Sequence, residues 1–135
     1  MIIRSLNRSR MSAEYDMKLQ SLLPSSDIPG IPFGSVFGSV PPGETSKRHT
    51  HQDGEVFIVL RGRAFVGLGD EEHEITVGDV CYLTPFRMHW IRNEADEPFD
   101  LVSLYREDPG TVVAELANQA PGRCWPSVPL SSARR

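Results

Sequence analysis

Short apolar runs separated by turn-forming residues fill the chain between residues 33 and 106. These runs are rich in β-branched, aromatic and small residues, which is typical of strands, and eleven Gly and eleven Pro supply the turns. The pattern predicts seven strands, at residues 33–40, 55–60, 64–68, 74–77, 80–83, 88–93 and 99–105. Arg61-Gly62, between the second and third of them, predicts a tight hairpin. Short strands at this spacing indicate an all-β domain, an antiparallel sandwich or barrel.

The segment before the first predicted strand has a different pattern. Residues 1–32 are predicted to form a leader that packs on the barrel. Ser12 is a suitable N-cap for a short helix that Pro24 would end. Tyr15 and Leu19 lie four residues apart, as residues on one helical face do. We therefore expect a short leader helix here.

The segment after the last predicted strand changes character again. Pro109-Gly110 interrupts the sheet pattern, and residues 111–118 are predicted to form a short helix. Residues 120–135 hold three Pro, three Ser and three Arg, the composition of a flexible tail or the start of a linker. The predicted division is thus a leader, a barrel over residues 33–106, and a C-terminal helix and tail over residues 107–135.

Charge narrows the range of partners. The 135 residues include 14 Lys or Arg and 18 Asp or Glu, which gives a formal net charge of −4. A mildly acidic chain without a basic block is a poor nucleic-acid binder, so no nucleic-acid partner is expected. Arg4, Arg8 and Arg10 make the first ten residues basic. We interpret them as a solvated end rather than as a phosphate or membrane contact.

Hydropathy and cysteine content indicate the expected compartment. The longest apolar run, residues 56–60, is too short to cross a bilayer, and the first residues lack the apolar block of a signal peptide. No membrane association is therefore expected. Cys81 and Cys124 are too few for a disulfide scaffold, which favours a reducing cytoplasm.

Three of the four histidines fall into one pattern with a glutamate. His49 and His51 lie two residues apart, and Glu55 follows four residues later. Alternate residues of a strand share a face, so these side chains can point into one cavity. Imidazole nitrogens and a carboxylate oxygen suit Fe, Mn, Ni, Co or Zn, and His89 on a later strand is the natural further donor. Taken singly, a surface histidine pair and an ordinary hairpin glutamate would explain the same residues.

The spacing of these residues resembles the two signatures of the cupin superfamily. The fixed positions of the first motif match Gly43, His49, His51, Glu55 and Gly62, and those of the second match Gly78, His89 and Asn93. The second motif departs from the family pattern, with Pro85 one position late and Phe86 where glycine is usual. The resemblance implies the cupin jelly roll, a double-stranded β-helix. It also implies a divalent transition metal bound inside the barrel by His49, His51, Glu55 and His89.

Other polar residues near these motifs have two interpretations each. Asp53 is expected either to hydrogen-bond a ligand histidine or to form a turn with Gly54. Asn93 is expected to bond the backbone, and Cys81 to be packed in the interior rather than reactive. His73 lies in a charged segment that we interpret as a solvated hairpin tip, not as a ligand.

Aromatic and basic residues near the predicted strands are candidates for a binding pocket or for the core. The aromatic candidates are Phe57, Tyr82, Phe86, Trp90 and Tyr105. Arg87, beside the His89 turn, would either meet an anionic substrate or face water.

A site of three histidines and one glutamate leaves coordination positions free for a substrate or O₂, which predicts a metal-dependent enzyme acting on a small molecule. Segments 32–34, 40–43, 49–55 and 82–86, with His89, resemble more narrowly the cupin domain of hydrazine synthetases. That resemblance implies N–N bond formation by rearrangement of an ester between an N-hydroxylated amine and an amino acid. A synthetase-like partner protein or domain would supply the ester. The alternatives are an Fe-dependent dioxygenase or isomerase of another small substrate, and a non-catalytic binding module.

The outer face of the second predicted strand suggests self-association. Val56, Ile58 and Leu60 lie on the face opposite Glu55 and would suit burial in a homodimer. The alternative is that the leader or the C-terminal helix covers this face. The ligand set does not select among the candidate metals.

Overall fold

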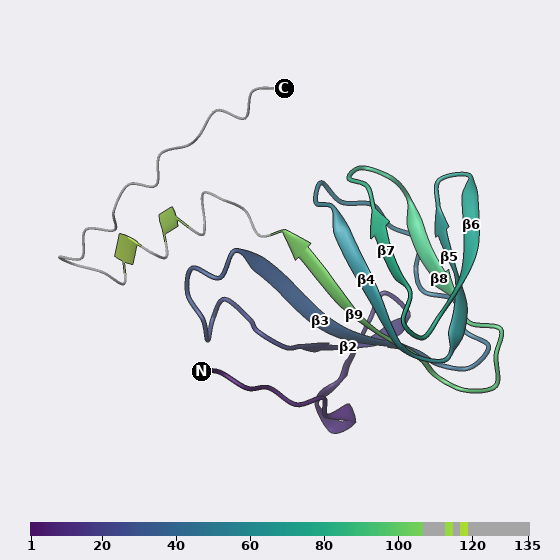
Figure 1. Ribbon diagram of the computed structural model, residues 1–135, viewed down its shortest axis with the longest axis horizontal. Helices are drawn as coiled ribbons and strands as arrows, with labels where there is room; N and C mark the ends of the chain where they lie inside the picture. The colour runs from purple at the N-terminus through teal and green to yellow at the C-terminus, as the bar shows by residue number, and fades with distance from the viewer. Residues whose placement is uncertain (107–112, 115–116, 119–135) are drawn as a thin grey trace.

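Two antiparallel sheets make up the fold, as the computed structural model shows for residues 1–106, 113–114 and 117–118 (Figure 1). The strands are β1 (Ser12–Glu14), β2 (Met17–Ser21), β3 (Phe33–Val40), β4 (Glu55–Arg61), β5 (Arg63–Leu68), β6 (Glu71–Thr76), β7 (Val80–Leu83), β8 (His89–Arg92) and β9 (Phe99–Arg106). A 3₁₀ helix, η1, spans Arg8–Arg10. The larger sheet has the order β1-β2-β3-β9-β4-β7 and the smaller one the order β6-β5-β8. This arrangement confirms the predicted all-β barrel.

The core fills one end of the space between the sheets. The buried apolar cluster comprises Met17, Val40, Phe57, Val59, Ala64, Val66, Ile75, Leu83, Ile91, Phe99 and Leu101. Burial of each large side chain of this kind contributes about 1.5–3 kcal/mol. Along β9 the inward positions change from Phe99 and Leu101 to the more polar Ser103 and Tyr105. The barrel therefore has an apolar end and a polar end, and Glu55 on β4 pairs with Tyr105 at the polar end.

The seven strands predicted from the pattern are all present. The bounds of β3 and β7 coincide with the prediction, whereas β6 begins at Glu71 rather than at residue 74. The pairing of Leu68 with Glu71 closes the hairpin directly after Gly69-Asp70. His73 therefore lies within β6, paired with Val66, and not at a hairpin tip as predicted.

The predicted leader helix is wrong, because this segment forms the hairpin of β1 and β2. Tyr15 and Asp16 have φ values of 53° and 56°, which make a tight turn and place Glu14 opposite Met17. Leu19 then pairs with Gly38 of β3. The segment satisfies its backbone hydrogen bonds on the edge of the sheet, and this tertiary pairing overrides the helical spacing of its apolar residues.

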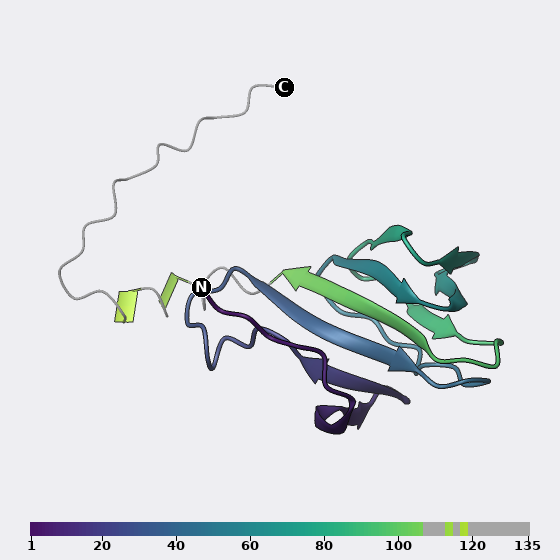
Figure 2. The ribbon, with the colours of Figure 1, turned by 60° about the horizontal axis from the view of Figure 1, so that its bottom comes forward.

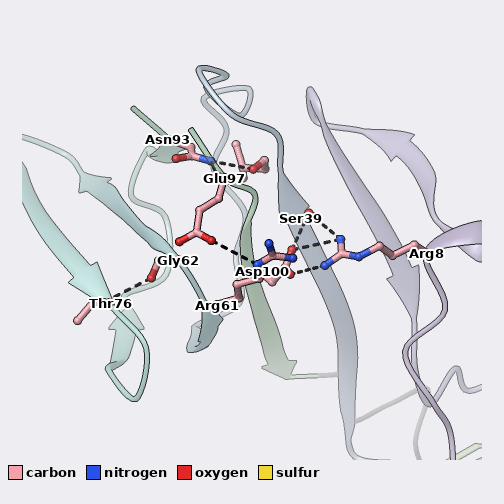
Figure 3. Close-up of polar contacts among 9 residues, drawn as sticks. Arg8, Ser39, Arg61, Gly62, Thr76, Asn93, Glu97 and Asp100 are labelled. Carbon is pink, nitrogen blue, oxygen red and sulfur yellow. Dashed lines mark hydrogen bonds and ion pairs between the residues drawn. The ribbon is translucent and has the colours of Figure 1, made fainter. Parts of the chain in front are cut away.

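The first ten residues are attached to the sheet rather than fully solvated. The Arg8 guanidinium lies 2.5 Å from Asp100 Oδ2, and the Ser39 hydroxyl donates to Asp100 Oδ1 at 2.7 Å (Figure 3). The Asn7 amide donates to Gln20 Oε1 at 2.8 Å. The N-terminal segment therefore lies beside β2 and β3, as Figure 2 also shows. Arg8 stays half-exposed, as the interpretation of a solvated end expects, but its guanidinium also forms an ion pair with a buried carboxylate.

The outer face of β4 carries the apolar residues considered for self-association. Val56 and Ile58 are half-buried and Leu60 is exposed. Self-association through this face stays a prediction.

The C-terminal predictions fall largely outside the described residues. Residues 113–114 and 117–118 are helical, and the rest of the predicted helix, the tail and Cys124 lie outside the described part of the chain. In the part that is described, no helix has the length and apolar character needed to cross a membrane.

Candidate metal centre

Backbone pairing brings two of the predicted ligands together. The amide of His89 donates to the His49 carbonyl at 2.9 Å, and the amide of His49 donates to the His89 carbonyl at 3.2 Å. This bridge places the segment before β4 against the edge strand β8, with the two imidazole centroids 4.3 Å apart. The ring of His51 lies 4.9 Å from that of His89. Residues 40 positions apart in the sequence thus converge at the polar end of the barrel.

Each of these imidazoles is held by a backbone carbonyl two residues away. Nδ1 of His49 lies 2.9 Å from the Lys47 carbonyl, and Nδ1 of His51 lies 2.8 Å from the Asp53 carbonyl. Nδ1 of His89 lies 3.0 Å from the Arg87 carbonyl. A carbonyl oxygen only accepts, so Nδ1 must carry the proton in all three rings. In the neutral imidazoles the lone pair is then on Nε2, which is the arrangement found in metal-binding histidines.

The three histidines are positioned to bind a metal ion. One nitrogen from each ring can be chosen so that all three lie within 4.8 Å of one another. Nε2 of His89, whose side chain is 3% exposed, is buried without a hydrogen-bond partner. A buried imidazole nitrogen without a partner is costly unless a cation or proton satisfies it. The donor set therefore fits a transition metal.

Glu55 lies beside this group. Its Oε2 is 3.1 Å from Nε2 of His51 and 3.4 Å from Nε2 of His89, and its other oxygen accepts a short hydrogen bond from Ser103. Lone pairs of one carboxylate oxygen and two imidazole nitrogens thus converge, and a cation between them would remove their repulsion. The compact group within 4.8 Å consists of the histidines alone, so Glu55 as the fourth ligand stays a prediction.

The electrostatics of the metal-free site favour the metal-binding forms of His49 and Glu55, but not that of His89. Burial lowers the pKa of His49, assisted by the neighbouring His89, although the Lys47 carbonyl and Glu55 oppose this shift. Burial would raise the pKa of Glu55, but its contacts with His89 and Ser103 outweigh burial and lower it. Burial also lowers the pKa of His89, yet its contact with Glu55 outweighs burial and raises it. A neutral His49 and an ionised Glu55 are the forms that donate to a metal.

The histidines face a cavity of about 340 Å³. The residues that line it beyond the predicted ligands are Glu14, Tyr15, Met17, Leu19, Val36, Gly38, Ser46, Asp53, Phe57, Trp90, Ile91, Leu101, Ser103 and Tyr105. Three of the aromatic candidates, Phe57, Trp90 and Tyr105, are therefore pocket residues. Tyr82 and Phe86 are 59% and 76% exposed and are not among the lining residues.

Sequence reasoning missed Tyr15. Its ring stacks on His49, with centroids 4.5 Å apart. In β2, Met17 and Leu19 line the cavity and Lys18 between them is exposed, but Gln20 is buried too, so the alternation is incomplete. So short a segment does not distinguish a hairpin from a helix by periodicity, so no local signal indicated the position of Tyr15.

The remaining candidates have structural roles. The Asp53 carbonyl lies 2.8 Å from Nδ1 of His51. Asp53 therefore hydrogen-bonds a candidate ligand histidine, which was one of its two predicted roles, through its backbone. Asn93 is 1% exposed, and its side-chain amide donates to the carbonyls of Val40, Pro41 and Glu97 (Figure 3 shows the last). It is structural, as predicted.

The side chains of Cys81, His73 and Arg87 lie away from the metal-binding group, although the Arg87 carbonyl contacts Nδ1 of His89. Cys81 packs against the apolar core, and burial raises the pKa of its thiol. His73 is exposed on β6 beside Glu71. Arg87 donates to the Leu68 carbonyl and lies 3.5 Å from Glu71, so it does not reach the cavity.

Phe86, which stands where the cupin motif usually has glycine, adopts a backbone conformation typical of glycine. Its φ of 62° lies in the left-handed region, where glycine is favoured and a bulky residue is strained. Its amide donates to the His51 carbonyl at 2.8 Å, which fixes the turn that leads to His89. The turn therefore keeps the glycine conformation although the residue differs.

Comparison with known proteins agrees with this geometry. The family model of the Cupin domain matches residues 36–105, more than half of the chain. The chain belongs to the cupin family. The matched range runs from β3 to β9 and contains all four predicted metal ligands.

Solved structures extend the likeness over most of this cupin. It is similar to a Cupin 2 conserved barrel domain protein of Salinispora arenicola, with 29% identity and a TM-score of 0.75 over 87% of this chain and 98% of that one. It is also similar to the plu4264 protein of Photorhabdus luminescens, with 30% identity and a TM-score of 0.77 over 88% of this chain and 98% of that one. A curated relative, the uncharacterized protein MJ1618 of Methanocaldococcus jannaschii, is 27% identical over 85 residues, which are 62% of this chain and 68% of that protein.

Proposed function

We propose that this cupin is a metal-dependent enzyme that acts on a small organic molecule. The observation that carries the proposal is the convergence of three imidazoles with fixed Nδ1 atoms at the end of a cavity large enough for a small ligand. His49, His51 and His89 would hold the metal through Nε2. A bound divalent metal would supply Lewis-acid or redox chemistry at this point.

The chain's own residues prepare the site for such a ligand. Ser103 holds one oxygen of Glu55, which leaves the other oxygen directed to His51 and His89. Phe57 and Trp90 form part of the wall, so apolar surface lies beside the polar donors of the site. Three or four protein ligands leave positions for a substrate, which distinguishes this arrangement from a closed structural site.

As the specific reaction we propose N–N bond formation from an ester of an N-hydroxylated amine with an amino acid. The α-amine nitrogen would form a bond to the hydroxylamine nitrogen while the N–O bond breaks, and the carboxylate would leave with that electron pair. The attacking amine loses one proton, so the step is a rearrangement that needs no external oxidant. The support is the resemblance of segments 32–34, 40–43, 49–55 and 82–86 to the cupin domain of hydrazine synthetases.

The test combines metal loading with turnover. Purified protein is reconstituted with Zn²⁺, Fe²⁺, Mn²⁺, Ni²⁺ or Co²⁺, and bound metal is measured by mass spectrometry. We expect about one ion per chain, lost in His51→Ala and His89→Ala but kept in His73→Ala, which removes an exposed histidine as a matched control. Absence of bound metal from every reconstituted sample would refute the metal-dependent function.

Turnover then separates the candidate activities. The loaded protein is incubated with a synthetic ester of an N-hydroxylated amine and glycine, and hydrazine products are sought by mass spectrometry. A hydrazine product supports the rearrangement, whereas its absence despite bound metal rejects it. Consumption of O₂ by the Fe²⁺ form with another small substrate would instead favour the dioxygenase, and metal binding without turnover of any substrate would favour the binding module.

A further inference from the structure

The charge of the cavity wall distinguishes among classes of ligand. Apart from the histidines, the charged residues among the described residues that line the cavity are Glu14, Asp53 and Glu55, and no Lys or Arg is among them. Glu55 is engaged with His51 and Ser103. Neither Glu14 nor Asp53 has an ion pair among the described residues.

The two arginines nearest the predicted ligands in the sequence are directed elsewhere. Arg48 precedes His49, but its guanidinium lies 3.8 Å from the centroid of the Trp90 ring, and Arg48 does not line the cavity. Arg87 precedes His89 by two residues and is held by the Leu68 carbonyl and Glu71. Within the described part of the chain, no lysine or arginine lines the cavity to receive a carboxylate or phosphate group of a ligand.

Charge balance at a loaded site also disfavours an anionic ligand. The three imidazoles are neutral donors, so a divalent ion with Glu55 leaves one net positive charge. The carboxylates of Glu14 and Asp53 together exceed that charge. A ligand that carries its own negative charge away from the metal would face them without a compensating partner.

The remaining residues that line the cavity are mostly apolar, which suits a ligand with an apolar body. Met17, Leu19 and Leu101 supply apolar surface. The ring of Trp90 already faces the Arg48 guanidinium and that of Tyr15 stacks on His49, so the carboxylates of Glu14 and Asp53 are what would attract a cationic group. Nε2 of His89 is buried without a hydrogen bond, 3.4 Å from Glu55, and His89 lines the same cavity, so the cavity has a polar end that can receive a metal.

We infer that the cavity takes a small organic amine, an apolar body with a cationic end placed near Glu14 and Asp53, and discriminates against dianionic and phosphorylated ligands. This inference rests on the proposed metal-dependent function, because the metal anchors the other end of the ligand. It adds the substrate class, which neither the fold nor the ligand set gives.

Three hydroxamic acids with the same chelating head and the same four-methylene chain test the inference. They end in an ammonium group (5-aminopentanohydroxamic acid), a methyl group (hexanohydroxamic acid) or a carboxylate (adipic monohydroxamic acid). Binding to the Co²⁺-loaded protein is followed by visible absorption and by calorimetry, with retained cobalt measured by dialysis. We expect the ammonium probe to bind about tenfold tighter than the methyl probe, and the carboxylate probe to bind weakest. Any other order overturns the inference.

Neutralising variants locate the effect. The double variant Glu14→Gln with Asp53→Asn should reduce the preference for the ammonium probe to about twofold or less. The matched control, Asp70→Asn with Glu74→Gln, removes two exposed carboxylates outside the cavity and should leave the order of affinities unchanged. An unchanged preference in the first variant overturns the assignment to Glu14 and Asp53.

The same experiment separates this inference from the proposed function. A protein that holds no cobalt, or shows no spectral change with any of the three probes, contradicts the metal-dependent function itself. A protein that holds cobalt and binds the three probes with equal affinity retains that function and contradicts only the substrate class.

Discussion

The ring of Tyr15 stacks on the imidazole of His49, with centroids 4.5 Å apart and planes inclined by 28°. The carbonyl of Tyr15 also accepts a hydrogen bond from the Lys47 amide at 2.7 Å, and the Lys47 carbonyl accepts one from Nδ1 of His49. The imidazole is therefore held on one face and at one edge. Tyr15 acts as a positioning residue for His49 and fixes the β1–β2 turn at the mouth of the cavity.

Removal of this stacking should weaken metal binding without abolishing it. An aromatic pair contributes about 0.5–1.5 kcal/mol, so Tyr15→Ala is expected to lower the affinity for Zn²⁺ by about two- to tenfold. Tyr15→Phe keeps the ring and should bind like the unmodified protein. Competition with a chromophoric chelator measures both affinities. Equal affinities for Tyr15→Ala and the unmodified protein would show that the contact does not position His49.

The barrel and most of the candidate site were predictable because both are encoded locally. Strands β3 and β7 follow from runs of residues bounded by Pro or Gly, and their bounds coincide with the prediction. His49, His51 and Glu55 lie within seven residues, so their convergence could be expected from an extended segment. The structure reaches it differently, because a bend at residues 52–53 separates His51 from Glu55, where β4 begins. His89 required the second motif, since nothing in the first segment indicates which later strand lies opposite.

The errors concern features that depend on distant partners. Tyr15 and Leu19 fit a helical face and also fit the hairpin, and the free edge of β3 decides between the two. Arg8 is half-exposed as expected, but its ion pair could not be predicted, because Asp100 lies 92 positions away in the sequence. Pairing of this kind is tertiary and leaves no mark in a local window.

Phe86 offers a stabilising substitution. Its φ of 62° is strained for a phenylalanine, while its side chain is 76% exposed and loses little on removal. Phe86→Gly is therefore expected to raise the free energy of unfolding by about 0.5–1 kcal/mol. Phe86→Ala removes the same ring but keeps the strain, so it should bring no gain. Chemical unfolding of the metal-free variants measures the difference, and a glycine variant no more stable than the alanine variant would argue against strain at this turn.

The ion pair of Arg8 and Asp100 should stabilise the N-terminal segment on the sheet. The Asp100 side chain is only 4% exposed, and Arg8 and Ser39 satisfy its oxygens. Arg8→Ala leaves this buried carboxylate with one partner fewer, so we expect a loss of about 1–3 kcal/mol in the free energy of unfolding.

A nearby pair provides the control for this prediction. Arg4→Ala removes the exposed pair with Asp27 and should cost less than about 1 kcal/mol. Adding Asp100→Asn to Arg8→Ala should recover part of the loss, because the buried charge is then gone. If urea unfolding shows the same stability for the two alanine variants, the pair with Asp100 does not hold the segment.

The thiol of Cys81 should react slowly at neutral pH. Burial raises its pKa, and the charges of Glu55 and Asp79 act in the same direction against a hydrogen bond from the backbone of Phe57. A raised pKa means less thiolate at any given pH, and the thiolate is the reactive form. In a Cys124→Ser background, alkylation of the folded protein by iodoacetamide at pH 8 is expected to be at least about tenfold slower than that of the urea-unfolded chain. The rate of the folded protein should rise with pH through a midpoint above that of the unfolded chain. A midpoint at or below that of the unfolded chain would contradict the buried, inert role of this cysteine.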